Sequence, residues 1–304
     1  MFVVDMHNDT LSGISAERGM TNEYNVSGKY PWLQFFAHFS HTGYGKPEER
    51  RRRALEAANV FLSECERLSL TRVSSVQDVF NVYENGLPGA MFTIEGGAGL
   101  FRDSHELDVL YRAGLRIMSI AWDKNELSSA ASDVIQTGLT LEGRNMVLRM
   151  AELGITLDVS HLSDQAFYEV FELSPMAHIA THSNFRAVCD HDRNLTDEMA
   201  KMIASRGGVI GLNLCPKFLR EDGYADADDI LRHVDYGLSL LGDRALAFGF
   251  DIDGTGGEYP IGIDSSRSIH DQVIELLLSK YSASTVERII GENVIDFLKD
   301  NLVT

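Results

Sequence analysis

The sequence is poor in cysteine, because its 304 residues include three, Cys65, Cys189 and Cys215. This number and the wide spacing exclude a disulfide framework and a cysteine-based zinc site. Scattered reduced thiols are typical of a reducing compartment, so the composition favours the cytoplasm. Cys215 directly follows a predicted strand, where we expect a buried thiol rather than a metal ligand.

Positive charge is also scarce. The chain has 27 Lys and Arg against 45 Asp and Glu, which gives a formal net charge of −18. Proteins that bind nucleic acid carry a basic patch or stripe. The one arginine run, residues 50–53, directly follows two glutamates and is expected on the solvated face of a helix. We therefore expect no nucleic-acid partner.

Long hydrophobic runs are missing. No apolar stretch approaches the roughly 20 residues that a membrane-spanning helix needs. The N-terminus has no basic region followed by a long apolar segment, so no secretory signal is expected. We find no low-complexity segment, linker or fixed-period repeat. These absences predict a cytoplasmic protein without a membrane partner. A chain of this length can fold as one large α/β domain or as two smaller ones, and we expect one barrel domain with C-terminal helices over residues 1–304.

Short apolar runs alternate with helical stretches along the chain. Phe2–Met6 is an apolar run broken by one Asp, as in a strand buried on both faces. Eight such runs are predicted strands: 2–6, 33–37, 89–94, 115–121, 155–159, 177–180, 208–214 and 245–250. Predicted helices occupy 48–68, 76–83, 104–113, 139–153, 164–171, 196–205, 227–241, 269–280, 284–290 and 293–301. Thr196 is a candidate N-cap and Gly154 a candidate C-cap.

This alternation predicts an α/β fold of the (β/α)8 TIM barrel type. The alternative is an open doubly wound sheet, which usually carries a glycine-rich phosphate loop after its first strand. Here His7, Asn8 and Asp9 occupy that place, and a polar, glycine-containing loop continues to about Tyr30. The barrel is therefore favoured.

Polar side chains follow the predicted strands where each one ends. In a TIM barrel the carboxyl ends of the strands form the active site. Each residue alone has an ordinary explanation, such as a turn carboxylate, a core histidine or a helix cap, but their joint occurrence at one end favours a shared site. The set comprises His7, Asp9, Glu95, His161, His182 and Asp251.

Three histidines and three carboxylates exceed what one zinc ion binds, since a catalytic zinc takes three protein groups. The number suits two metal ions that share a carboxylate. Such a pair lowers the pKa of a shared water and polarises a carbonyl group, and a carboxylate that does not bind metal can carry protons.

Several motifs resemble those of the membrane (renal) dipeptidase family, one branch of the metal-dependent amidohydrolase barrels. The resemblance runs over essentially the whole chain, and its most specific part is DVSH followed about twenty residues later by HSN. The motifs are DMHNDT at 5–10, QFFA at 34–37, TIEGG at 93–97, LDVSH at 157–161, THSN at 181–184, RN at 193–194 and DIDG at 251–254.

The resemblance implies a dinuclear metal site with two Zn²⁺ per chain, or with Mn²⁺ or another divalent metal in their place. His7 and Asp9 would bind one ion, and His161 and His182 the other. Glu95 would bridge both ions, and a bridging hydroxide would attack the peptide carbonyl. The resemblance also implies a homodimer and tolerance of a D-residue at the C-terminal position of the dipeptide.

Two further roles follow from the resemblance. Asp251 would be the proton-handling catalytic carboxylate, whereas Asp253 is expected to shape the next loop. Arg193 would bind the terminal carboxylate of the substrate, which its planar guanidinium suits. From the residues alone, a surface salt bridge is the commoner role for such an arginine.

One departure from the family pattern concerns the end of the fourth strand. Members such as the renal enzyme place a histidine there, whereas this chain has Trp122, followed by Asn125. Either side chain would replace the histidine as the donor that holds the tetrahedral intermediate, or that role is lost and the specificity differs. The ordinary alternative is that Trp122 is only a wall of the pocket. Tyr259 is another candidate for the substrate pocket.

The leading hypothesis is a dinuclear zinc dipeptidase acting on small dipeptides. A second hypothesis, motivated by the missing histidine, is an amidohydrolase for N-acyl amino acids or cyclic amides. A third is an inactive barrel that serves as a binding protein.

Overall fold

The computed structural model describes residues 1–12, 28–100 and 104–302. The polar loop predicted after the first strand falls mostly outside these residues. Parallel strands form a sheet in the order β6-β5-β4-β2-β1-β8-β7. The strands are β1 (Val3–Asn8), β2 (Trp32–Phe39), β3 (Thr71–Arg72), β4 (Gly89–Glu95), β5 (Ile117–Met118), β6 (Thr156–Leu157), β7 (Ile210–Leu212) and β8 (Leu246–Phe248).

Two parallel bridges close the sheet into a barrel. Asp158 pairs with Ile179, and Ala180 pairs with Ile210, so the segment 179–180 connects β6 to β7. The TIM-barrel prediction is therefore confirmed. The predicted strand 177–180 is reduced to these bridges, and β3, which pairs with β4 beside the barrel path, was not predicted.

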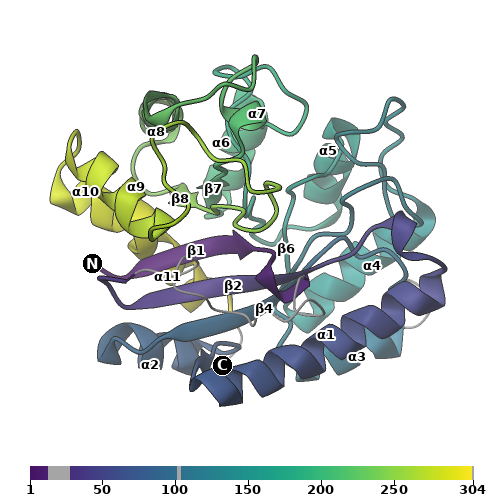
Figure 1. The fold of residues 1–304 in the computed structure, drawn as a ribbon. Helices are drawn as coiled ribbons and strands as arrows, with labels where there is room; N and C mark the ends of the chain where they lie inside the picture. The colour runs from purple at the N-terminus through teal and green to yellow at the C-terminus, as the bar shows by residue number, and fades with distance from the viewer. Residues whose placement is uncertain (13–27, 101–103, 303–304) are drawn as a thin grey trace.

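Helices cover the outside of the sheet (Figure 1). The long α1 packs on β4, with Phe61 and Phe92 ring centroids 5.5 Å apart. The helices are α1 (Pro47–Leu68), α2 (Val76–Asn85), α3 (Ser104–Arg112), α4 (Leu141–Leu153), α5 (Asp164–Leu173), α6 (Asp197–Ser205), α7 (Pro216–Leu219), α8 (Ala227–Leu241), α9 (Ile269–Leu278), α10 (Ala283–Glu287) and α11 (Asn293–Asn301). No helix among the described residues combines the length and apolar character needed to cross a membrane.

Helix ends follow capping chemistry. The side chain of Thr196 accepts a hydrogen bond from the Met199 N–H, and Gly154 is left-handed with φ 73°, as predicted. The helix predicted from residue 139 begins at Leu141, because the Thr140 side chain caps it by accepting from the Gly143 N–H. The short α7 was not predicted.

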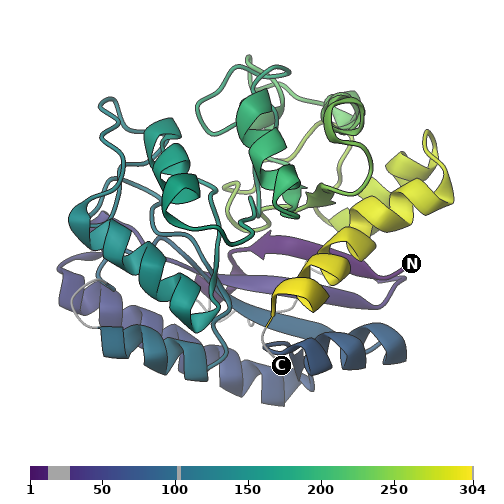
Figure 2. The same cartoon turned by 180° about the vertical axis from the view of Figure 1, so that it is seen from behind.

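The C-terminal helices run together. A π-helical turn, Arg288–Glu292, joins α10 to α11, so the two helices predicted there form one nearly continuous rod. Viewed from behind, α11 descends toward the C-terminus near α2, and both helices contribute to one apolar cluster with β1 and β2 (Figure 2). This packing lies away from the polar ends of the strands and stabilises the barrel there.

Candidate metal centre and active site

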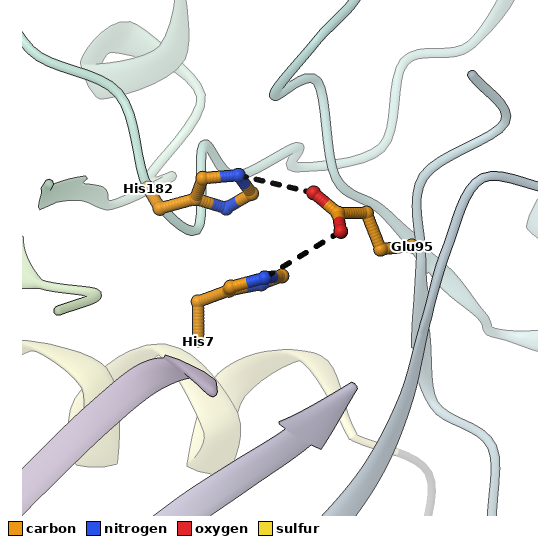
Figure 3. A group of neighbouring side chains, drawn as sticks. All are labelled: His7, Glu95 and His182. Carbon is orange, nitrogen blue, oxygen red and sulfur yellow. Dashed lines mark ion pairs between the residues drawn. The ribbon is translucent and has the colours of Figure 1, made fainter. Parts of the chain in front are cut away.

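The sequence-predicted ligands meet at the carboxyl ends of the strands. Glu95 ends β4, and its carboxylate faces both His7 and His182 (Figure 3). Its Oε1 is 2.7 Å from His161 Nε2 and 3.2 Å from His182 Nε2, whereas its Oε2 is 3.7 Å from His7 Nε2. The two oxygens of one carboxylate thus face different histidines, which is the arrangement of a bridging ligand.

His7 faces three carboxylates. Its Nε2 lies 3.5 Å from Asp9 Oδ2 and 3.8 Å from Asp251 Oδ1, in addition to Glu95. Burial alone would lower the pKa of His7, but the charges of Glu95, Asp9 and Asp251 together raise that pKa to about 10. The charge of the cluster therefore favours a cation at this point.

The residues fit a divalent metal on three grounds. Ligand atoms that share one zinc ion at about 2.1 Å lie roughly 3–4 Å from each other, and the distances between these atoms run from 2.7 to 3.7 Å. Two buried polar atoms, His7 Nε2 and Asp9 Oδ1, have no hydrogen-bond partner. Two groups have potential ligand atoms within 4.8 Å of one another: His7, Glu95 and His182, and His7, Asp9 and Asp251.

The carboxyl groups are held in an unfavourable environment for negative charge. Burial, followed by the charge of Glu95, raises the pKa of Asp9, and burial raises the pKa of Glu95. Burial, reinforced by Asp9 and Glu95, raises the pKa of Asp251 to about 7. A bound cation would relieve this repulsion.

His161 and His182 are suited to bind metal as neutral imidazoles. Burial, followed by nearby positive groups, lowers the pKa of each well below its ordinary value. Their Nε2 atoms lie 2.9 Å apart. Neutral imidazole nitrogens are the form that coordinates metal ions.

Backbone strain is concentrated at the same place. Among the described non-glycine residues, four have positive φ, and Ser69 is the C-cap of α1. The other three are His161 (φ 69°), Asp251 (φ 58°) and Asp253 (φ 67°). Such conformations cost free energy and are typical of functional sites.

Buried polar groups that sequence reasoning did not select hold the strand ends. Asp5 Oδ1 accepts hydrogen bonds from the His7 N–H (3.2 Å) and the Phe250 N–H (2.9 Å), which joins β1 to the segment before Asp251. The Ser119 hydroxyl accepts from the N–H that follows Glu95 (2.9 Å). A lone Asp inside the apolar first strand was the available signal.

Because Gly254 has no side chain, the carboxylates of Asp251 and Asp9 can lie close to its backbone. A Cβ atom on this residue would lie 2.1 Å from Asp251 Oδ1 and 2.4 Å from Asp9 Oδ2. The Asn213 side chain donates to Asp251 Oδ2 at 2.9 Å. Asp253 instead accepts a hydrogen bond from the Thr10 hydroxyl at 2.7 Å, which connects the loop after β8 to the loop after β1.

Arg193 lies beside the metal ligands and is 7% exposed. Its guanidinium donates to Ser183 Oγ (3.3 Å) and the His182 carbonyl (3.2 Å), and lies 5.4 Å from the centroid of the Phe218 ring. Its buried Nε has no hydrogen-bond partner. Burial lowers its pKa, although Glu95 favours its charged form. Arg193 also borders the cavity described next.

A cavity of about 780 Å³ opens above the centre. Trp122 lines it and packs against Phe39 (ring centroids 4.8 Å apart) and His41 (5.6 Å). Asn125 is not among the lining residues, because its side-chain amide bonds to backbone groups of its own loop, including the carbonyl of Ile120. The lining includes Asp9, Ser12, Tyr44, Glu95, Ser132, His161, His191, Arg193, Cys215, Lys217, Phe218, Asp251 and Glu258.

Two other predicted positions have different surroundings. The part-buried Tyr259 packs against the main apolar cluster and does not line the cavity, although its neighbour Glu258 does. Cys215 does border the cavity, as a buried free thiol whose pKa is raised by burial.

Known proteins resemble this chain in sequence and structure. It is 29% identical over 237 residues to an uncharacterised protein of Klebsiella pneumoniae, a match covering 74% of this chain and 87% of that one. It is also 29% identical over 227 residues to a dipeptidase of Claviceps purpurea, covering 73% of this chain and 53% of the relative.

Two solved structures extend the comparison. A metallopeptidase called dipeptidase AC superposes with a TM-score of 0.87 at 25% identity, covering 100% of this chain and 99% of its own. A metallopeptidase of Rhodobacter sphaeroides, bound to a phosphinate mimic of the dipeptide L-Ala-D-Ala, gives 0.85 at 25% identity, covering 99% of both chains.

Residues 1–302 match the sequence model of one family, described as membrane dipeptidase (peptidase family M19). The chain therefore belongs to the membrane dipeptidase family of metallopeptidases, peptidase family M19.

Proposed function

We propose that this protein hydrolyses small dipeptides with two divalent metal ions, zinc in the first instance, held at the mouth of the barrel. The observation that supports this most directly is the position of Glu95, whose two oxygens face different histidines inside one buried cluster. When bound, two such ions would activate a shared water and polarise the scissile carbonyl.

The ligands divide into two sets around Glu95. His7 and Asp9, from the end of β1, would hold one ion, and His161 and His182 the other. Their side chains are between 1% and 13% exposed, so bulk water competes little with the metal ions. Glu95 would bind in both sets.

Asp251 is proposed to accept a proton from the attacking water at Oδ1 and to return it to the leaving amine. Its Oδ2 is occupied by the Asn213 amide, which leaves Oδ1 facing His7 and the cavity. A carboxyl oxygen in this position can take up a proton and then release it.

Arg193 is proposed to bind the terminal carboxylate of the dipeptide. Arg193 lines the same cavity as Asp9, Glu95 and His161, so a carboxylate bound there lies near the proposed metal ions. The Rhodobacter relative, bound to a mimic of L-Ala-D-Ala, supports tolerance of a D-residue at that end.

Trp122 is proposed to form a wall for the substrate where other members place a histidine. Of the two candidates from the sequence, it faces the cavity and Asn125 does not. Its indole N–H is a donor without any acid function.

A dipeptide screen tests the proposed function. Purified protein with zinc or manganese added is incubated with L-Xaa-L-Xaa and L-Xaa-D-Xaa dipeptides and with N-acyl amino acids, and bound metal is quantified on the same sample. We expect dipeptide cleavage and about two metal ions per chain. Cleavage of N-acyl amino acids alone would instead favour the second hypothesis, which the missing histidine motivates. Empty sites without hydrolysis would favour a binding protein.

A further inference from the structure

A buried chain of hydrogen bonds leads away from His182 on the side opposite Glu95. Thr181 Oγ1 lies 2.8 Å from His182 Nδ1 and 2.5 Å from Asp158 Oδ2. Asp158, Thr181 and His182 are each no more than 3% exposed. Water therefore does not replace these contacts.

The direction of these hydrogen bonds follows from the number of protons available. A carboxylate only accepts hydrogen bonds, so the Thr181 hydroxyl uses its single proton to donate a hydrogen bond to Asp158. Toward His182 the hydroxyl oxygen is then an acceptor, which requires a proton on Nδ1. The proton-free nitrogen is Nε2, the atom that lies 3.2 Å from Glu95 Oε1.

Asp158 also holds the two loops that carry His161 and His182. Its Oδ1 accepts from the Ser160 N–H and from the Thr181 N–H, both at 2.9 Å. These are the residues directly before His161 and directly before His182. One carboxylate therefore sets the relative position of the two loops and, through Thr181, the orientation of one ring.

We propose that Asp158 and Thr181 are positioning residues that hold His182 as the Nδ1–H tautomer, with the Nε2 lone pair directed into the metal centre. Partners of this kind fix ring orientation and increase ligand affinity. The inference rests on the proposed metal site for its consequence. In the metal-free chain His182 Nε2 also lies 3.2 Å from Glu95 Oε1 and 2.9 Å from His161 Nε2, so the tautomer there shows whether Thr181 or Glu95 holds the ring proton. Neither residue lines the cavity.

The first test reads the tautomer directly. Long-range proton–nitrogen NMR correlation on metal-free, histidine-labelled protein separates the Nδ1–H from the Nε2–H form, and the signals of His182 are identified by their loss in His182→Asn. We expect the Nδ1–H form in the wild type. An Nε2–H signal for His182 would overturn the proposal, whatever the activity of the enzyme.

The second test measures zinc affinity by competition with a chelator. Thr181→Val removes the hydroxyl at nearly constant volume and is expected to weaken binding of the zinc ion by about 10- to 100-fold. Thr181→Ser keeps the hydroxyl and is expected to restore most of the affinity. Circular dichroism melts confirm that each variant is folded.

Thr93→Val is the matched control, because the Thr93 hydroxyl is also buried in the barrel and has no hydrogen-bond partner. Its zinc affinity is expected to equal that of the wild type. Equal affinity in folded Thr181→Val and wild type would contradict the proposal. Failure of the wild type to bind zinc would count against the proposed function, while the NMR result would still decide the tautomer.

Discussion

At the scale of single residues, Asp251 has a buried side chain and a left-handed backbone conformation. Its carboxylate also accepts a hydrogen bond from the Asn213 side chain. Asp251→Asn keeps the shape and tolerates positive φ, but it cannot accept a proton. We expect kcat to fall by about 10²- to 10⁴-fold. Steady-state kinetics with zinc content and melting temperature measured in parallel check this, and an unchanged kcat would contradict the proposed role.

Arg193 tests recognition of the substrate carboxylate. Arg193→Lys keeps the charge but loses the planar pair of donors. Losing a hydrogen bond to a charged group costs about 1.5–3 kcal/mol, so kcat/KM for dipeptides should fall by about 10- to 100-fold.

Dipeptide amides serve as comparison substrates, since they lack the carboxylate and should be cleaved poorly by both enzymes. Arg144→Lys is the matched variant, because Arg144 pairs with Glu169 away from the cavity and is 40% exposed. If Arg193→Lys and Arg144→Lys behaved alike, Arg193 would have no special part in binding.

Trp122 distinguishes a pocket wall from a hydrogen-bond donor. Trp122→Phe keeps an apolar ring and removes the N–H, whereas Trp122→Ala removes both. If the residue is a wall, only the alanine variant should lose activity, by about 10-fold or more on dipeptides with large apolar side chains and less on Gly-Gly. Comparable losses in both variants would indicate a donor instead.

At the scale of elements, the helices are more regular than the strands. Thr196 was identifiable from the sequence as the cap of α6, and its side chain accepts from the Met199 N–H. Thr196→Ala should lower the free energy of unfolding by about 1 kcal/mol, and Thr196→Ser by less. Urea denaturation measures both, and kcat should stay unchanged because α6 lies outside the cavity lining.

Several strands are shorter than the apolar runs that predicted them, whereas β2 and β4 are longer. The run 115–121 contributes Ile117–Met118, and the run 155–159 contributes Thr156–Leu157. These residues are apolar because they are buried. The regular strand nevertheless ends early, and the loop that follows carries the polar groups at the carboxyl end of the barrel. Hydrophobic pattern reports burial, and strand pairing is decided by the neighbouring backbone.

At the scale of the whole molecule, three histidines away from the metal centre limit acid stability. Burial lowers the pKa values of His38, His178 and His233 to about 4. In the unfolded chain they titrate near 6.5, so below that pH the unfolded state binds more protons than the folded state. Stability should therefore fall as pH drops from about 6.5 to 4, by on the order of 3 kcal/mol for each histidine.

Urea denaturation of the metal-free protein across this pH range checks the effect. His178→Phe removes one titrating group, so the fall in stability should be less steep. A phenyl ring suits this position because Phe171 already packs against the His178 ring. The same slope for the variant and the wild type would show that His178 contributes nothing to it.

The sequence by itself determined the alternation of strands and helices, the barrel and the residues that end each strand, because burial and capping leave periodic and local signals. His7, Glu95, His161, His182 and Asp251 could be selected since each stands where an apolar run stops. The tertiary structure alone decided which oxygens of Glu95 face which histidines, that Trp122 and not Asn125 borders the cavity, and that Asp5, Asp158 and Thr181 hold the strand ends. These depend on contacts between residues far apart in the chain, whose distances no local pattern records.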